Sequence, residues 1–317
     1  MKKYGVIGTG AIGGYYGGRL ARSGQDVHFL FHGDYDYVKE HGLQVDSCDG
    51  SFHLDQVNAY SGTADMPPCD VVLVCLKTTN NHLLKELLPP LLTPNTVVVL
   101  IQNGIGVEAD VQQMFPETAI VAGLAFICSA KTEPGRVNHQ FYGSINLGNY
   151  SCQDGVRLYS ILDDFKNAGV EAALVSYDEA RWKKAVWNMP FNGMTVALNT
   201  QTNKLLQNPS TRRLIRDLML EVIHAAQHLG VSNLDESFAE KMLQTTDEMT
   251  PYSPSMKLDY EFHRPMEIHY IYTRPLEMMR NAGFHAPKLE MLEAMLRFVA
   301  PSSPSQPPQG EEKPSGW

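Results

Sequence analysis

Residues 4–14 read Tyr-Gly-Val-Ile-Gly-Thr-Gly-Ala-Ile-Gly-Gly, a short apolar run that leads directly into a G-x-G-x-x-G turn. A helix-like stretch follows, and a second apolar run occupies residues 27–31. In this order Gly8 permits the tight turn, Gly10 lets a pyrophosphate approach the backbone, and Gly13 lets the helix pack closely on the strand. The stretch therefore predicts a dinucleotide-binding fold in preference to a merely structural glycine turn.

The first half of the chain alternates apolar runs with helical patterns. Residues 71–74 and 97–100 are continuous runs of valine and leucine, which is typical of parallel strands buried on both faces. From residue 176 to 299 the periodicity is almost entirely helical. We therefore predict an α/β fold: a Rossmann-like dinucleotide-binding domain over residues 1–175, followed by an all-α helical domain over residues 176–300.

The same patterns place the individual elements. Strands are expected at residues 4–7, 27–31, 43–45, 52–57, 70–76, 96–101, 119–127, 136–141, 144–147 and 172–175. Helices are expected at residues 82–88, 210–229, 235–244, 255–262, 268–281 and 287–299. Ligand sites commonly form where two domains meet, so we expect the active site in the cleft between them.

The composition is that of a globular protein with a core: 43% of the 317 residues are hydrophobic and 19% are charged. The net charge is −9, and no block rich in lysine or arginine occurs, so nucleic acid and anionic membranes are not expected as partners. No apolar stretch is long enough to span a bilayer, and the glycine motif begins too early for a signal peptide, which indicates a cytoplasmic protein. Residues 301–317 are rich in proline and serine and are expected to form a disordered tail.

The cysteines and histidines give no indication of a metal. The five cysteines are an odd number without CxxC spacing, which favours a reducing compartment and no zinc site. The histidines at 224, 228, 263 and 269 lack carboxylates at a convincing metal-binding spacing. His139 follows a strand-like pair and is a candidate proton carrier, but a structural histidine with satisfied hydrogen bonds is the favoured interpretation.

Lys184, Asn188 and Asn192 are spaced four and four, so they form one polar stripe on a helix. One ammonium and two carboxamides can position an oxygen-rich ligand and offer a proton. Taken alone, the stripe is more often a solvated helix face. Pro190 removes a backbone donor and is expected to kink the helix between the two asparagines.

Four motifs together resemble those of one known family. They are Trp182, Lys184, Asn188 and Asn192 in a W-x-K-x-x-x-N-x-x-x-N pattern, Lys77 in a turn after a strand, Gln102-Asn103-Gly104 after the next strand, and Ser255-Met256…Asp259 with Glu267-Ile268. In these residues the chain resembles the ketopantoate reductase family (2-dehydropantoate 2-reductases), over about residues 3–299. The resemblance implies an enzyme that uses NADPH to reduce a 2-oxo acid to a 2-hydroxy acid.

The resemblance also implies roles for individual residues. Lys184 would be the general acid, because negative charge develops on the carbonyl oxygen as hydride arrives. Partial burial would lower the pKa of this lysine, and Glu267 would oppose that shift. A structural ion pair between the two is the alternative. Asn188 and Asn192 would bind the carbonyl and hydroxyl groups of the substrate, and Ser255 its carboxylate, although Ser255 also reads as a helix N-cap.

The cofactor residues follow from the glycine motif and the resemblance. Asn103 would lie near the nicotinamide ribose and the substrate, unless it is only a turn residue. Lys77 would approach a phosphate or ribose, unless it is a solvated strand end. The family resemblance favours NADPH. His32 stands where many family members have the arginine that contacts the 2′-phosphate, and because a histidine lacks the guanidinium group, NADH is not excluded. The expected cofactor contacts are Gly8, Thr9, Gly10, Ala11, Ile12, Gly13, His32, Lys77 and Asn103.

We therefore predict NADPH-dependent reduction of 2-dehydropantoate to pantoate, a step of pantothenate and coenzyme A biosynthesis. One alternative is a reductase of another branched 2-oxo acid, because Tyr252, Pro254 and Pro190 depart from the family pattern near the substrate. The other alternative is a non-catalytic protein that senses NAD(P). A homodimer is compatible with the sequence.

Overall fold

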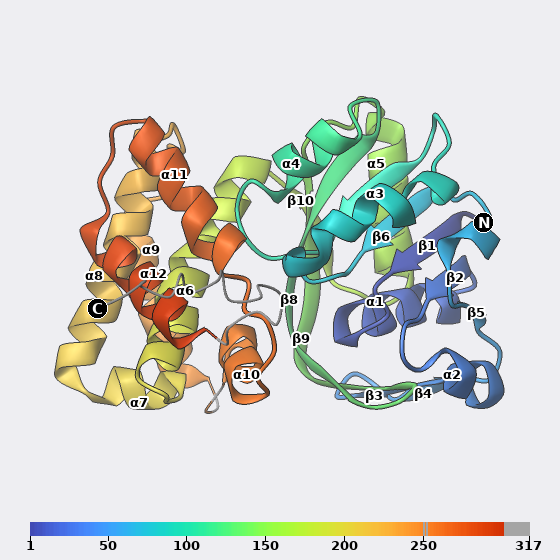
Figure 1. Cartoon of the computed structure of the whole chain (residues 1–317), viewed down its shortest axis with the longest axis horizontal. Helices are drawn as coiled ribbons and strands as arrows, with labels where there is room; N and C mark the ends of the chain where they lie inside the picture. The colour runs from blue at the N-terminus through green and yellow to red at the C-terminus, as the bar shows by residue number, and fades with distance from the viewer. Residues whose placement is uncertain (250, 252, 301–317) are drawn as a thin grey trace, which may run out of the picture.

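The computed structural model describes residues 1–249, 251 and 253–300. The predicted tail at 301–317 and the substitution at Tyr252 lie outside the described residues. Figure 1 shows a sheet-and-helix half and a helical half side by side, with β8 and β9 between them. This is the predicted fold: a Rossmann-like α/β part followed by an all-α part.

A single mixed sheet organises the first half. Its strands lie in the order β4-β3-β9-β8-β7-β6-β1-β2-β5, and β10 pairs with β9. The strands are β1 (Lys3–Ile7), β2 (Asp26–Leu30), β3 (Leu43–Ser47), β4 (Phe52–Leu54), β5 (Asn58–Tyr60), β6 (Val71–Val74), β7 (Val97–Leu100), β8 (Ala119–Glu133), β9 (Arg136–Asn149) and β10 (Ala172–Val175). β6 and β7 are buried along their whole length, as their unbroken apolar sequences predict.

Helices cover both faces of this sheet and join its strands. They are α1 (Ala11–Arg22), α2 (Tyr35–His41), α3 (Leu84–Leu87), α4 (Val107–Met114) and α5 (Gly155–Asn167), with 3₁₀ turns at η1 (Thr63–Asp65), η2 (Thr78–Leu83) and η3 (Pro89–Leu91). The helix predicted at 82–88 is therefore a 3₁₀ turn followed by one short α-helix. The first helix and its flanking parallel strands, β1 and β2, are placed as the glycine motif predicts.

The expected strands 119–127, 136–141 and 144–147 are parts of one long antiparallel hairpin, β8–β9. The prediction of two separate strands across 136–147 was wrong. Tyr142 and Gly143 have positive φ values of 66° and 111°, and the pairing register shifts nearby, so the strand bends without ending. The hairpin thereby extends the sheet along the helical half, where α6 packs against it.

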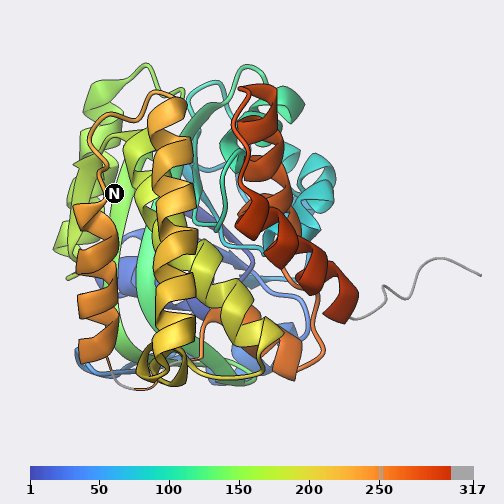
Figure 2. The ribbon, with the colours of Figure 1, turned by 90° about the vertical axis from the view of Figure 1, so that its left-hand side faces the viewer.

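The helical half is built around the long helix α6 (Tyr177–Ala197), against which α8, α10 and α12 pack. Figure 2, which views the molecule from this side, shows the helices in front of the sheet. The others are α7 (Thr202–Gln207), α8 (Pro209–His228), α9 (Ser237–Glu248), α10 (Ser255–Glu261), α11 (Arg274–Asn281) and α12 (Pro287–Val299), with a π-helical turn, η4 (His269–Thr273), before α11. The helix predicted at 268–281 is thus η4 and α11 in succession.

Two features of α6 bear on the predictions. The helix is assigned without a break through Pro190, so the proline does not end it between the two asparagines. Ser176 is its N-cap, directly after β10 ends at Val175. We propose the domain boundary at this junction. No helix in the described part of the chain combines the length and apolar character needed to cross a membrane.

Candidate active site

A cleft of about 1880 Å³ is lined by residues of both halves. It collects the glycine turn, the ends of β2, β6 and β7, the β8–β9 hairpin, and one side each of α6, α9 and α10. Thirteen of the fourteen site residues predicted from the sequence line this cleft: Gly8, Thr9, Gly10, Ala11, Ile12, His32, Lys77, Asn103, Lys184, Asn188, Asn192, Ser255 and Glu267.

The exception is Gly13, which does not line the cleft. A Cβ atom at this position would lie 2.4 Å from the carbonyl oxygen of Gly8, so the residue serves the close packing of α1 on the turn. Gly8 has φ of +93°, and a side chain there would meet the backbone of Leu76. At Gly10 no atom lies within 4 Å of the Cβ position, so the backbone is open to an approaching group.

The N-terminus of α1 has the features of an anion site. Gly10 caps it without any side-chain hydrogen bond, and no acidic residue lies in the first turn. The first N–H groups of a helix lack internal partners and carry partial positive charge. A dinucleotide pyrophosphate therefore fits this turn both sterically and electrostatically.

The end of β2 leads to His32, the residue predicted to lie near a 2′-phosphate. His32 is exposed there and lines the cleft. The nearby Asp34 is buried and accepts a hydrogen bond from the backbone of Gly135 at 3.0 Å. It also forms a 2.6 Å ion pair with Lys131, a cleft residue of β8 that the sequence did not single out. Its carboxylate thus anchors the hairpin.

Lys184 projects from α6 and donates a 2.7 Å hydrogen bond to the carbonyl oxygen of Ala125 on β8. The pKa of this lysine is lowered to about 7: burial is the largest cause, the charge of Arg181 acts in the same direction, and the charge of Glu267 opposes them. The predicted directions are therefore confirmed. An ammonium group with a pKa near 7 can both donate and accept a proton readily at neutral pH.

Glu267 is held by Thr78 at the start of η2. Its buried carboxylate accepts hydrogen bonds from the backbone N–H of Thr78 at 2.9 Å and from the hydroxyl at 2.8 Å. Among the described residues, Glu267 bonds Thr78 and Lys184 bonds the Ala125 carbonyl, and no ion pair within 4.0 Å joins the two, contrary to the alternative of a simple structural ion pair. Glu267 acts on the lysine through its charge at longer range.

The amides of α6 and the serine of α10 share the cleft with Lys184. Asn188 is half-buried, whereas Asn192 is buried and accepts a long hydrogen bond, 3.4 Å, from the backbone N–H of Met256. Ser255 is exposed and is the first residue of α10. Pro254 occupies the cap position and no side chain caps the helix, so the N-cap interpretation of Ser255 was wrong.

The turn that carries Asn103 is fixed from the helical half. Arg181 of α6 donates a 2.7 Å hydrogen bond to the carbonyl oxygen of Gln102 and forms an ion pair with Glu108. Both charged side chains are fully buried, and Tyr177 donates a 2.9 Å hydrogen bond to the second carboxylate oxygen of Glu108. Neither Arg181 nor Glu108 was predicted, because their partners lie more than seventy residues away along the chain.

Lys77 is not a free strand-end lysine. It forms an ion pair with the buried carboxylate of Asp259 on α10, which Arg264 also contacts at 3.0 Å. The remaining carboxylate oxygen, Oδ2, is buried without a hydrogen-bond partner in the structure. The Lys77 side chain as a whole is 40% exposed, and the residue lines the cleft.

Both ring nitrogens of His139 have hydrogen-bond partners, as predicted. It is buried, its Nδ1 lies 2.8 Å from the hydroxyl of Ser47, and its Nε2 lies 3.1–3.2 Å from the carbonyl oxygens of Phe141 and Tyr142. It does not line the cleft.

Comparison with known proteins identifies the family. The family model described as ketopantoate reductase PanE/ApbA matches residues 4–151, and the model of its C-terminal part matches residues 176–300. The chain belongs to the ketopantoate reductase family. It is 44% identical to a 2-dehydropantoate 2-reductase of Nostoc sp., over 94% of this chain and 95% of that protein.

Solved structures agree with this family assignment. A 2-dehydropantoate 2-reductase from Geobacter metallireducens superposes with a TM-score of 0.91 at 39% identity, over 94% of this chain and 99% of that one. A D-mandelate dehydrogenase in a ternary structure with NADH and anilino(oxo)acetate superposes with a TM-score of 0.86 at 21% identity, over 94% and 98% of the two chains. The second likeness shows the fold alone.

Proposed function

We propose that this protein reduces 2-dehydropantoate, or a closely related branched 2-oxo acid, to the 2-hydroxy acid with NADPH, and so supplies pantoate for pantothenate and coenzyme A biosynthesis. One observation carries the proposal. The ammonium of Lys184, with a pKa of about 7, lines the same cleft as the glycine turn of Gly8–Gly13. An acid and a dinucleotide site are the two parts that carbonyl reduction needs.

The first half would hold the cofactor. The turn at Gly10 and the N-terminus of α1 receive the pyrophosphate, and Asn103 stands at the end of β7, where open α/β sheets bind ligands. His32 and Lys131 offer positive charge or donors to a 2′-phosphate, which favours NADPH. Lys77 can turn from Asp259 toward a phosphate or ribose. When bound, the nicotinamide supplies the hydride.

Lys184 would supply the proton. Its Nζ is held by the carbonyl oxygen of Ala125, which leaves two further N–H donors for the substrate. As negative charge develops on the substrate oxygen, the ammonium stabilises it and then gives up a proton. A pKa of about 7 suits both tasks, because the charged form is available at neutral pH and the transfer is not strongly uphill.

The amides and the serine would orient the substrate. Asn188 donates to the reacting oxygen from one turn beyond Lys184, and Ser255 donates to the carboxylate across the cleft. The side-chain oxygen of Asn192 accepts a hydrogen bond from the backbone N–H of Met256, so its NH₂ group would be the part that binds the substrate. Glu267 keeps Lys184 partly charged in an environment that otherwise disfavours it.

The test is oxidation of NADPH and of NADH against a panel of 2-oxo acids: 2-dehydropantoate, a smaller unbranched acid and an aryl-substituted acid. We expect turnover with 2-dehydropantoate and a higher kcat/KM with NADPH. Turnover of another acid alone would select the alternative of a different 2-oxo acid reductase. Cofactor binding without turnover of any acid would select the non-catalytic sensor and refute the proposal.

The predicted homodimer remains a prediction. Exposed apolar side chains gather on α12 at Met291, Met295 and Phe298, which are spaced four and three along the helix. Light scattering coupled to gel filtration would give the mass in solution. A monomeric mass at micromolar concentration would contradict the prediction.

A further inference from the structure

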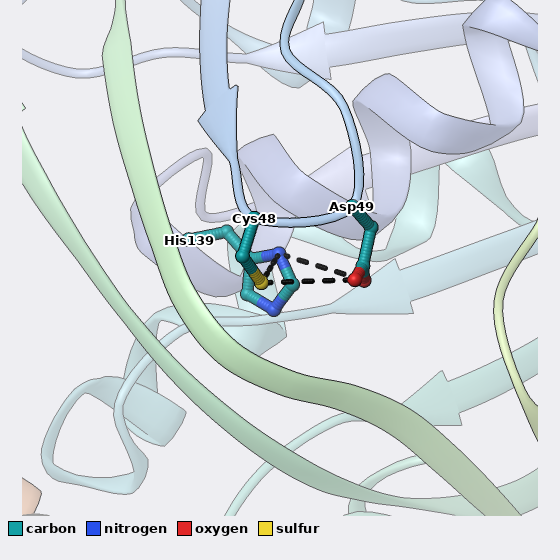
Figure 3. A group of neighbouring side chains, drawn as sticks. All are labelled: Cys48, Asp49 and His139. Atoms are coloured by element: carbon teal, nitrogen blue, oxygen red, sulfur yellow. Dashed lines mark hydrogen bonds and ion pairs between the residues drawn. The ribbon is translucent and has the colours of Figure 1, made fainter.

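A thiol, a carboxylate and an imidazole meet at a place remote from the cleft. Cys48 and Asp49 are exposed in the loop between β3 and β4, and His139 comes from β9, about ninety residues later in the chain. Figure 3 shows the three side chains converging on one another. None of them lines the active-site cleft, and the proposed function uses none of them.

The imidazole is oriented by groups outside this trio. Its Nε2 lies 3.2 Å from the carbonyl oxygen of Phe141 and 3.1 Å from that of Tyr142. Carbonyl oxygens only accept, so Nε2 carries the proton and Nδ1 is the acceptor. The nearest partner of Nδ1 is the Ser47 hydroxyl at 2.8 Å, and Cys48 Sγ and Asp49 Oδ2 lie farther away, at 3.8 and 4.0 Å. Metal-ligating histidines are typically held in this way, with the second ring nitrogen donating to a backbone carbonyl. The ring also packs on Tyr15, with centroids 4.4 Å apart, which limits its rotation.

The spacing of the three ligand atoms is close to that of a tetrahedral zinc site. With zinc–sulfur bonds of about 2.3 Å and zinc–nitrogen or zinc–oxygen bonds of about 2.0–2.1 Å, the edges of the tetrahedron are about 3.3–3.6 Å. Here Cys48 Sγ lies 3.8 Å from His139 Nδ1 and 3.7 Å from Asp49 Oδ1, and His139 Nδ1 lies 4.0 Å from Asp49 Oδ2. These two Asp49 distances use different carboxylate oxygens, whereas a single oxygen from Asp49 lies within 4.8 Å of both other ligand atoms, so an edge needs to shorten by up to about 1.5 Å. Rotation of the exposed Cys48 and Asp49 side chains would supply this movement.

We propose that Cys48, Asp49 and His139 form a binding site for a divalent cation of the zinc type. On binding, the Cys48 thiol loses its proton to solvent and the sulfur becomes a thiolate ligand, while the hydroxyl of Ser47 gives up its 2.8 Å contact with Nδ1. Water occupies the fourth position. The mixed sulfur, nitrogen and oxygen donors suit zinc and cobalt and disfavour magnesium and calcium.

The neighbouring charges set the strength of the site. Ionised Asp49 and the thiolate balance the two charges of the cation, but Arg19 Nη2 lies 3.8 Å from Asp49 Oδ2 and 3.4 Å from the Ser47 hydroxyl. This guanidinium competes for the carboxylate, so the site binds more weakly than a closed structural zinc site. A bound cation links the β3–β4 loop to β9 and thereby stabilises the edge of the sheet, away from the reaction. The spacing of cysteines and histidines in the sequence does not reveal this site, because only the fold brings His139 next to Cys48 and Asp49.

Cobalt(II) tests the proposal, because a cobalt–thiolate bond has an intense near-ultraviolet charge-transfer absorption. The untagged full chain, kept reduced with a phosphine, is titrated with Co²⁺ and then with Zn²⁺. We expect one charge-transfer site per chain, displaced by Zn²⁺. Cys48→Ser should abolish the band, and Asp49→Asn should weaken cobalt binding at least tenfold. Both residues are exposed, so the variants should fold, which their circular dichroism checks.

Asp55→Asn is the matched control. Asp55 is an exposed carboxylate that lies 3.6 Å from the imidazole of His53. This pair consists of a carboxylate and an imidazole, without a thiol. Its cobalt affinity should equal that of the natural protein. The proposal is overturned if the natural protein gives no charge-transfer band at millimolar Co²⁺, if the band survives in Cys48→Ser, or if Asp49→Asn binds cobalt as well as Asp55→Asn does. These results do not depend on turnover of a 2-oxo acid.

Discussion

Replacing Lys184 by methionine removes the proposed proton donor and keeps most of the side-chain volume. Loss of a general acid typically costs about 10²–10⁴-fold in rate, so kcat should fall by that amount. The pKa of about 7 adds a pH dependence in the natural protein. The acid form is needed and disappears as pH rises through 7, so kcat should fall roughly 90-fold between about pH 6 and pH 9 where proton transfer limits the rate. The methionine variant should lose this limb of the profile.

The assay is steady-state oxidation of NADPH with saturating 2-oxo acid across this pH range, together with a separate measurement of the Kd of NADPH. Lys183→Met is the matched control: Lys183 lies one residue away on α6, lines the cleft and pairs with Glu179. Its removal should leave kcat and the pH profile nearly unchanged. The reasoning is refuted if Lys184→Met retains kcat within a factor of about three, or if both variants lose activity equally.

Three further predictions follow from the geometry. Gly10→Ala should weaken NADPH binding about tenfold or more, as titration measures, without lowering the melting temperature, whereas Gly13→Ala should destabilise the fold by about 1–3 kcal/mol, because its Cβ would meet the Gly8 carbonyl; the reverse pattern would contradict the assigned roles. Arg181→Met should cost about 3–5 kcal/mol of unfolding free energy by leaving Glu108 buried and unpaired, and Glu108→Gln in that background should recover part of the loss. Urea unfolding checks this, and additive losses would contradict it. His32→Arg should raise the kcat/KM ratio of NADPH to NADH about tenfold; an unchanged ratio would place the 2′-phosphate elsewhere.

The parts of the fold that could be predicted are those whose causes are local. The glycine turn needs the positive φ of Gly8, and the buried strands β6 and β7 need unbroken apolar runs, so both can be predicted from the sequence. The length of the β8–β9 hairpin could not be predicted from the sequence. Its polar residues and the bend at Tyr142 interrupt the alternation that identifies a strand, and only pairing with the neighbouring strand keeps it continuous.

The residues of the candidate site also fall into a predicted group and a missed group. The residues at motif positions, such as Lys184 and Asn103, were found because their spacing is local or because the family pattern names them. The residues that hold them were missed. Thr78 donates a hydrogen bond to Glu267, 189 residues away in the sequence, and Arg181 donates one to Gln102, 79 residues away. A single sequence contains no signal that pairs such distant residues. Gly13 was assigned to the cofactor because the motif contains it, although its effect is steric and indirect.

These missed contacts explain why neither half could form the site alone. Two of the proposed functional side chains of the helical half are held by the sheet half: Lys184 by the carbonyl of Ala125, and Glu267 by Thr78. In the opposite direction, Arg181 of α6 fixes the turn that presents Asn103. A proton donor must stay within hydrogen-bond reach of the reacting oxygen, and small displacements are costly to rate. The packing between the halves is therefore part of the proposed catalytic geometry, and substitutions that loosen it should reduce kcat even where they touch neither substrate nor cofactor.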